Sequence, residues 1–239
     1  MTRPAATASP APIHPAVYSA NLVEPIAAWL RAHATGGDLL DPCAGLGHRL
    51  AEIAGRAGLA PHGVEIERGY FAAAAVHSCV ELGDATALGF PDGSVGAAVT
   101  SFVYPNGMAD CFTARDPSAR NTYVHRLRAH LGGDYGMAEH NMAGIGHVRA
   151  PGPAQERFYE LQAAIVAEVH RVLAPGAPFV VNTKDPPRQT YTERTRVQLA
   201  AAGFEIVETA AIPARGLNHG AHQHAGKAAH EDLTLAVKP

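Results

Sequence analysis

The chain has 239 residues, of which 47% are hydrophobic, which is enough to bury a full core and is typical of one globular domain. No stretch approaches the roughly 18 consecutive apolar residues of a transmembrane helix, so we expect no membrane span. The formal net charge of −3 disfavours a strongly basic nucleic-acid-binding protein. Three cysteines, Cys43, Cys79 and Cys111, are too few for a disulfide framework and favour a reducing, cytoplasmic location.

The first part of the chain, 1–12, is rich in Ala, Pro and Thr and lacks the apolar core of a signal peptide. We interpret it as a flexible tail, and residues 13–239 as a single domain. The first predicted element is a helix at 21–34, because apolar residues recur there at the spacing of one helix face. These residues are Leu22, Val23, Ile26, Trp29 and Leu30.

A glycine-containing turn follows a short apolar strand at 38–40. The turn reads Asp-Pro-Cys-Ala-Gly-Leu-Gly (residues 41–47), and a helical pattern at 48–54 comes directly after it. Gly45 and Gly47 can adopt positive φ and expose backbone amides at a helix N-terminus to an anionic or carboxylate-bearing ligand. The alternative is an ordinary strand-to-helix turn, because only part of a dinucleotide fingerprint is present.

Three further strands are predicted, separated by helical spacers. The second strand, 61–67, carries Glu65 near its end, about twenty residues after the glycine turn, where an acid can accept hydrogen bonds from ribose hydroxyls. The third, 81–85, ends in Asp84, and the fourth spans 95–101. Ligands of open α/β sheets bind at the carboxyl ends of the strands, so these acids should cluster at one sheet edge.

Residues 105–153 show no periodicity and are repeatedly interrupted by glycine. A loop this long inside a domain is usually functional or disordered, so we interpret it as a substrate-recognition insert. Arginines and aromatic residues alternate between 111 and 130, a pattern that can contact phosphates and stack on bases. The alternative is a solvated surface loop whose arginines pair with acids elsewhere.

The remaining pattern predicts a helix at 153–173, which Pro175 and Gly176 end. It is followed by a strand, a helix and two strands that could pair antiparallel, at 177–183, 189–202, 204–212 and 232–237. Alternating strands and helices with a late hairpin fit a doubly wound α/β sheet that carries an antiparallel pair at its edge.

Fourteen residues are histidines, and four of them gather before the last predicted strand, at His219, His222, His224 and His230. A metal site needs three or four converging ligands, and this loop-like spacing has no acid nearby until Glu231. We therefore expect no metal and interpret the segment as a loop over the substrate. His140 and His147 in the insert stay ambiguous, since a histidine can act as a general base near neutral pH.

These motifs resemble those of the S-adenosylmethionine-dependent methyltransferases, and within them the group that methylates amino groups of nucleic-acid bases. The resemblance covers most of residues 13–110 and, more loosely, 154–239. Residues 41–47 are similar to the glycine-rich motif that lies along the methionine part of the cofactor. Glu65 is similar to the acid that holds the ribose, and Asp84 to the acid beside the adenine.

The segment from His14 to Ser19 is similar to the one that closes over the methionine end of the cofactor in DNA amino-methyltransferases. The resemblance thus implies S-adenosylmethionine as cofactor. The cofactor-binding residues that it implies are His14, Tyr18, Ser19, Asp41, Pro42, Gly45, Gly47, Glu65, Ile66, Asp84, Ala85 and Ser101.

Residues 100–104 fall where the family carries a Ser/Asp/Asn-Pro-Pro-aromatic motif. The catalytic residues that this implies are Ser101, Phe102 and Tyr104: Ser101 and the backbone at Phe102 accept hydrogen bonds from the target amine, and Tyr104 stacks on the base. Phe102 and Val103 replace the two prolines that stiffen this loop in the family. The implied substrate contacts are Tyr104, Asn106, Arg115, Arg120, Tyr123, Arg126 and Arg128.

The fold that the resemblance implies is a Rossmann-like class I methyltransferase: a doubly wound, mostly parallel seven-stranded α/β sheet with an antiparallel edge strand. The implied activity is methyl transfer to an exocyclic amine of a nucleic-acid base, in DNA rather than RNA, at cytosine N4 or adenine N6. By the same resemblance, a serine at position 101 favours cytosine N4 over adenine N6 as the target. In a duplex the base must first be flipped out.

Three alternatives differ in their chemistry. Methylation at cytosine C5 needs a cysteine nucleophile and is disfavoured, because Cys43 lies in the cofactor turn and Cys111 lies too far beyond Tyr104. A small-molecule methyltransferase would account for the acidic balance. An inactive module that binds S-adenosylmethionine or nucleic acid would account for the lost prolines. The sequence does not specify an oligomeric state.

Overall fold

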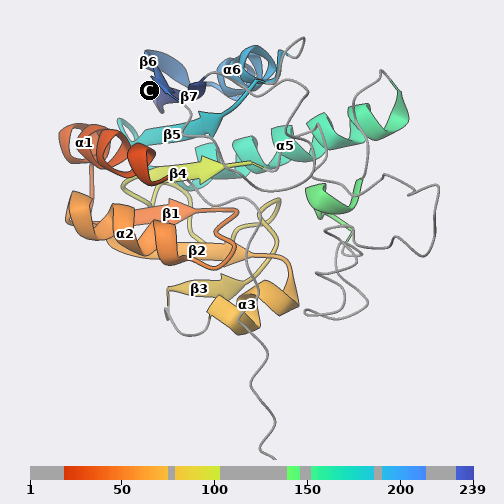
Figure 1. The fold of residues 1–239 in the computed structure, drawn as a ribbon, viewed down its shortest axis with the longest axis horizontal. Helices are drawn as coiled ribbons and strands as arrows, with labels where there is room; N and C mark the ends of the chain where they lie inside the picture. The colour runs from red at the N-terminus through yellow and green to blue at the C-terminus, as the bar shows by residue number, and fades with distance from the viewer. Residues whose placement is uncertain (1–18, 75–78, 103–138, 146–151, 186–189, 214–229) are drawn as a thin grey trace, which may run out of the picture.

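The computed structural model describes residues 19–74, 79–102, 139–145, 152–185, 190–213 and 230–239 (Figure 1). Seven strands form one sheet in the order β3-β2-β1-β4-β5-β7-β6. In chain order they are β1 (Asp38–Asp41), β2 (Ala60–Glu65), β3 (Val80–Leu82), β4 (Ala98–Ser101), β5 (Pro178–Thr183), β6 (Glu205–Pro213) and β7 (His230–Val237). The strands β1 to β5 are parallel, and β7 runs antiparallel to both of its neighbours, β5 and β6. The predicted α/β fold with an antiparallel pair at one edge is confirmed.

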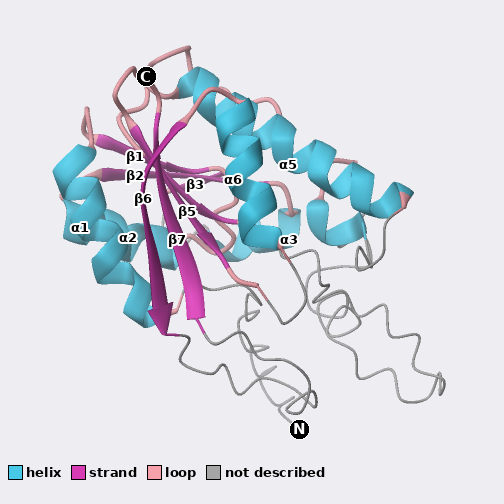
Figure 2. Ribbon diagram, turned by 90° about the horizontal axis from the view of Figure 1, so that it is seen from above, coloured by secondary structure: helices cyan, strands magenta, loops and turns pink. Residues whose placement is uncertain are grey.

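Helices cover both faces of the sheet (Figure 2). The helical elements are η1 (Ala20–Leu22), α1 (Val23–His33), α2 (His48–Ala57), α3 (Arg68–Ala74), η3 (Met142–Ile145), α5 (Pro153–Val172) and α6 (Tyr191–Ala201). The helices α1 and α2 pack on one face, and α5 and α6 lie on the other. Within the described segments, no helix is both long and apolar enough to cross a bilayer.

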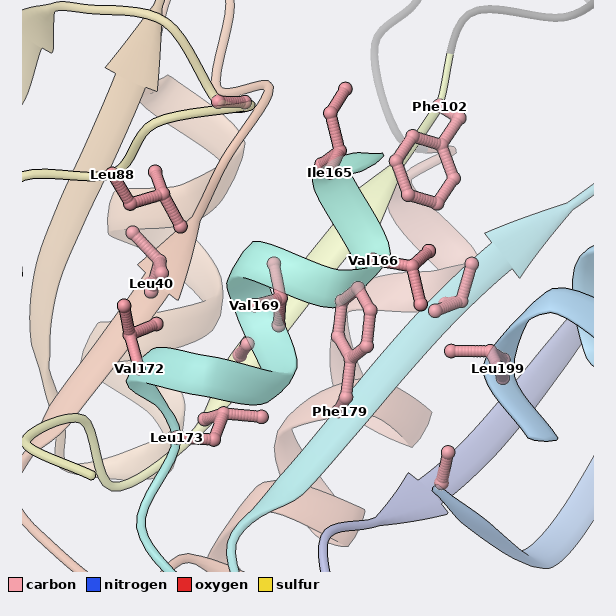
Figure 3. Packing of buried hydrophobic residues seen from close by; sticks show 14 of the residues in the cluster. Leu40, Leu88, Phe102, Ile165, Val166, Val169, Val172, Leu173, Phe179 and Leu199 are labelled. Carbon is pink, nitrogen blue, oxygen red and sulfur yellow. The ribbon is translucent and has the colours of Figure 1, made fainter. Parts of the chain in front are cut away.

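Alternation along the strands builds two core layers, because successive side chains of a strand point to opposite faces. On β1, Leu39 joins the layer under α1 and α2, whereas Leu40 joins the layer under α5. On β5, Val180 joins the layer under α1 and α2, and Phe179 joins the layer under α5. Figure 3 shows the apolar stripe of α5 against this second layer. Its buried members are Phe158, Leu161, Ile165, Val166, Val169 and Val172.

The connection from β3 to β4 differs from the prediction, which placed a helix there. Residues 83–97 contain turns and no helix. Contacts to α5 hold this backbone instead: Arg171 donates to the carbonyl of Leu88 at 2.9 Å and pairs with Asp92 at 2.6 Å. The amide of Leu88 in turn donates to Glu168 at 2.9 Å. These partners are distant in sequence, so a local pattern could not reveal them.

The predicted fourth strand is also shorter in the structure. It begins at Ala98 and not at Val95, which forms an isolated bridge with Leu173. The other predicted elements are present with small shifts of their ends.

The reversed direction of β7 places its end at the edge where the parallel strands begin. Lys238, just beyond β7, is fixed there by hydrogen bonds. Its Nζ donates to the carbonyl of Leu173 at 2.7 Å, and its backbone amide donates to Ala177 at 3.1 Å. The end of the described chain is therefore held against the start of β5.

Candidate functional site

The polar residues singled out in the sequence meet at one edge of the sheet. Because β1 to β5 are parallel, all five end at this carboxyl edge, and β7 begins there (Figure 1). Asp41, Glu65 and Ser101 are the last residues of β1, β2 and β4, and Asp84 follows the end of β3. The predicted gathering of acids at one edge is therefore what the topology produces.

The turn after β1 is held by a buried aspartate and two left-handed glycines. Oδ1 of Asp41 accepts hydrogen bonds from the amide of Cys43 and from Oγ1 of Thr100 on β4, both at 3.0 Å. Gly45 and Gly47 have φ values of 57° and 72°, a region that disfavours other residues. A Cβ on Gly47 would also lie 2.5 Å from a methyl carbon of Val80. The turn therefore requires glycine and leads directly into α2.

Glu65 is joined to this turn by a hydrogen bond. Its Oε2 accepts from the amide of Gly45 at 2.9 Å, and its Oε1 accepts from the amide of Glu67 at 2.7 Å. The residue is only 7% exposed, and burial raises its pKa to about 7 against the opposing effect of the two amides. Each carboxylate oxygen has two acceptor sites, so each keeps one beyond these bonds. Glu65 is thus a buried acid with acceptor capacity left.

Asp84 stands beside Glu65 and is held by Thr86 and His140. Its Oδ1 accepts from the amide and the hydroxyl of Thr86 at 2.8 and 2.7 Å, and its Oδ2 lies 2.6 Å from Nδ1 of His140. Burial would raise the pKa of Asp84, but these hydrogen bonds outweigh burial and hold the pKa below its usual value. The Asp84 carboxylate is therefore ionised at neutral pH and fixed in orientation.

A segment at the end of the predicted insert docks on the two acidic strand ends. Besides the contact of His140 with Asp84, Nδ2 of Asn141 donates to Oε1 of Glu67. Met142 follows and is buried in the core layer under α5. The role of His140 was ambiguous from the sequence, and Asn141 and Glu67 could not be recognised there, because no local pattern links residues so distant in the chain.

At the end of β4, Ser101 and Phe102 point in different directions. Oγ of Ser101 donates to Oδ1 of Asn182, its neighbour on β5, at 3.1 Å. The Phe102 side chain is fully buried among the residues of α5 (Figure 3). Only the backbone of Phe102 is left for the predicted contact with an amine. Asn182 was missed, although a polar residue that ends the apolar run of β5 was a usable indication.

Ser19, at the start of the described chain, meets the beginning of β7. Its hydroxyl donates to Oε1 of Glu231, which is only 5% exposed. Nζ of Lys184 lies 4.0 Å from the same oxygen. Of the other residues implied for the cofactor, Pro42 and Ala85 are buried, and Ile66 is half-buried beside Glu65.

Several predicted site residues lie outside the described residues: His14, Tyr18, Tyr104, Asn106, Arg115, Arg120, Tyr123, Arg126 and Arg128, together with Cys111 and the histidines at 219, 222 and 224. Cys43 is described, and burial followed by the negative charge of Asp41 raises the pKa of its thiol well above the usual value. A thiolate nucleophile is therefore disfavoured at Cys43. Among the residues that the structure describes, no group of three His, Cys, Asp or Glu side chains could hold a metal ion.

Comparison with known proteins gives likeness in structure alone. No family model matches the chain, and no curated protein sequence matches it. A putative methyltransferase from Haloferax volcanii, solved in complex with the Trm112 methyltransferase activator, is 15% identical with a TM-score of 0.53, and the match covers 92% of this chain and 91% of that one. The [4+2]-cyclase SpnF is 16% identical with a TM-score of 0.54, over 92% and 80% of the two chains.

A third similar structure is an S-adenosylmethionine-dependent methyltransferase from Methanosarcina mazei. It is 14% identical with a TM-score of 0.51, and the match covers 87% of this chain and 95% of that one. Because one fold hosts unrelated functions, this likeness bears on architecture and not on substrate. The chain has the Rossmann-like fold of the S-adenosylmethionine-dependent methyltransferases.

Proposed function

We propose that the protein binds S-adenosylmethionine at the carboxyl edge of its sheet and transfers the methyl group to an exocyclic amine of a nucleic-acid base. The observation that carries the proposal is the hydrogen bond between Glu65 and Gly45, which joins the glycine turn to the acid at the end of the next strand. Asp84, beside this pair, supplies a second acid at the next strand end. The order of turn and acids matches the order of methionine, ribose and adenine in the cofactor.

The residues present fit this cofactor. The free acceptor sites of Glu65 suit the two ribose hydroxyls, and Asp84 with Ala85 suits the adenine edge. The backbone at Gly45 and Gly47 carries no side chain that would keep the methionine part away. When bound, S-adenosylmethionine supplies an electrophilic methyl group with a sulfur leaving group.

The acceptor that we propose is cytosine N4 or adenine N6, in DNA rather than RNA. The amine nitrogen forms a bond to the methyl carbon while the carbon–sulfur bond breaks, the sulfur keeps the electron pair, and the amine releases a proton to solvent. Such a step requires chiefly that the amine be aimed in line with the leaving group. We assign this aiming to Ser101 and the backbone carbonyl of Phe102, and stacking on the base to Tyr104.

The burial of Phe102 bears on whether the altered motif is active. In the family, two prolines stiffen the loop after the fourth strand. Here the fully buried Phe102 side chain anchors the start of that loop in the core. This anchoring supports an active enzyme over an inactive binding module, because it offers another way to fix the carbonyl of Phe102. The arginines at 115, 120, 126 and 128 in the predicted insert at 105–153 would contact phosphates.

A small-molecule amine is the second candidate acceptor. The net charge of −3 favours it, because a duplex-binding protein usually presents a basic face. The similarity to a [4+2]-cyclase also shows that this fold supports chemistry other than methyl transfer.

The protein is incubated with S-adenosylmethionine labelled in the methyl group. Parallel reactions contain single-stranded DNA, duplex DNA, RNA or a metabolite extract as the candidate substrate. We expect label in DNA, as N4-methylcytosine or N6-methyladenine after digestion. Label in a metabolite would establish the second candidate. Binding of S-adenosylmethionine without any labelled product would mean that the protein is a binding module.

A further inference from the structure

Two adjacent residues, His140 and Asn141, contact the ends of two neighbouring strands. Nδ1 of His140 lies 2.6 Å from Oδ2 of Asp84, just beyond β3. Nδ2 of Asn141 donates to Oε1 of Glu67, just beyond β2. The amide of Glu67 in turn donates to Glu65 at 2.7 Å. The pair therefore reaches both of the acids to which we assign the adenosine part of the cofactor.

The pair is itself fixed from both sides. Asn141 is only 6% exposed, and Met142 after it is buried in the core layer under α5. On the other side, Arg157 of α5 donates to the backbone carbonyl of Glu139 at 3.1 Å. With these anchors, the contacts to the two strand ends are part of the built fold and not the touch of a surface loop.

The carboxylate of Asp84 has one acceptor site left for a ligand. A carboxylate offers about four such sites, two on each oxygen. The amide and the hydroxyl of Thr86 occupy both sites of Oδ1, and His140 occupies one site of Oδ2. Oγ1 of Thr86 also lies 3.0 Å from Nδ1 of His140, which closes a triangle of contacts. Within the described part of the chain, the remaining site is therefore on Oδ2.

A ligand that uses this site must lie against His140. Two nitrogen donors that share one oxygen stand about 4–5 Å apart, because each lies about 2.9 Å from the oxygen and the two sites diverge. The ionised carboxylate of Asp84 only accepts, so the proton of its contact with His140 is on Nδ1. For the same reason the ligand group at this site is a donor, such as the amino group of adenine.

We infer that His140 and Asn141 complete the adenosine end of the cofactor site. His140 is a positioning residue, which fixes Oδ2 of Asp84 so that its remaining acceptor site meets the amino group of adenine. Asn141 is a second positioning residue, which holds Glu67 and, through the amide of Glu67, the carboxylate that binds the ribose. The inference rests on the proposed function and deepens it, because it assigns the end of the segment 105–153 to the cofactor and not to the methyl acceptor.

The test compares two ligands that differ in one group. They are S-adenosylhomocysteine and its analogue with hydrogen in place of the purine amino group, and their dissociation constants are measured by calorimetry. The unchanged protein should bind S-adenosylhomocysteine about tenfold to a hundredfold more tightly, because the amino group donates to a charged acceptor. In His140→Ala the affinity for S-adenosylhomocysteine should fall about tenfold, whereas the affinity for the analogue should change less than about threefold.

Further variants separate the two roles. His140→Asn should restore the preference, because its amide nitrogen can replace Nδ1 as the donor. Asn141→Ala should weaken both ligands by the same factor, about threefold to tenfold, because the ribose is common to both. His62→Ala is the matched control: Nε2 of His62 lies 3.0 Å from Asp38 at the start of β1, and this pair is similarly exposed. It should bind both ligands as the unchanged protein does.

The outcomes separate this inference from the proposed function. Equal losses of both ligands in His140→Ala, or no loss of either, would overturn the inference even if DNA is methylated. A loss confined to S-adenosylhomocysteine would uphold it even if no methylated product forms. If the unchanged protein binds neither ligand, the cofactor site and the inference fall together. Thermal melts show which variants fold, and if His140→Ala does not, His140→Leu fills the space of the ring and should show the same selective loss.

Discussion

The pKa of Glu65 predicts an unusual dependence of stability on pH. This carboxyl titrates at about 7 in the folded protein and at its ordinary value of 4.5 in the unfolded chain. Between these values the folded state holds a proton that the unfolded chain releases. The contribution of Glu65 to stability is therefore fully present below pH 4.5 and lost as pH rises through 7. The difference corresponds to about 3 kcal/mol in the free energy of unfolding.

The assay is urea denaturation of the unchanged protein and of Glu65→Gln at pH 5 and at pH 8. Between these pH values the unchanged protein should lose about 2–3 kcal/mol relative to the variant, whose side chain does not titrate. Glu52→Gln is the control: Arg49 chiefly lowers the pKa of Glu52 from its ordinary 4.5, so most of its titration lies below pH 5 and the comparison should be nearly flat. The reasoning would be refuted if the stability difference between the unchanged protein and Glu65→Gln did not change with pH. It would also be refuted if the unchanged protein gained stability relative to the variant as the pH rose.

The same proton should be linked to cofactor binding. Ribose hydroxyls that donate to Glu65 would favour its charged form and lower its pKa, so binding should release a proton near pH 7. Lowering the pKa by one unit corresponds to a tenfold change in affinity. We therefore expect S-adenosylmethionine to bind the unchanged protein about fivefold more tightly at pH 8 than at pH 6, with this dependence lost in Glu65→Gln. Calorimetry that finds the same dependence in both proteins would remove Glu65 from the site.

Three further predictions address the acceptor side and the core. Tyr104→Ala should lose about 1–3 kcal/mol of substrate binding while cofactor affinity stays constant, and Tyr104→Phe should keep most activity. If Tyr104→Ala instead lowers the melting temperature and weakens the binding of both substrate and cofactor, Tyr104 is a core residue. Replacing Arg120, Arg126 and Arg128 should lower the salt dependence of DNA binding by about one unit per lost phosphate contact, and an unaltered slope would show that these side chains bind no phosphates. Phe102→Ala should cost about 3–5 kcal/mol in urea denaturation, whereas a loss near zero would contradict its burial in the core.

The sequence predicted the parts of the site that a local pattern encodes. Each of the acids Asp41, Glu65 and Asp84 interrupts or follows a short apolar run, which is how the end of a buried strand looks in sequence. Parallel strands then bring such ends together without further information. The two glycines were recognisable because the turn needs positive φ, which glycine adopts far more readily than other residues.

Contacts between distant residues could not be predicted in this way. His140 reaches Asp84 across 56 positions, and Ser101 reaches Asn182 across 81. The helix wrongly placed after β3 failed for the same reason, because Arg171 on α5 fixes that backbone from outside. Tertiary contacts of this kind override local propensity.

The reversal of β7 also has a practical consequence for attaching other molecules to this protein. Because β7 leads away from the carboxyl edge and Lys238 is held near the start of β5, Pro239 lies at the opposite edge from Glu65, Asp84 and Ser101 (Figure 1). A fluorophore, a surface linker or a fused domain joined to Pro239 would project away from the bound ligands. Immobilisation through that end therefore suits the binding measurements.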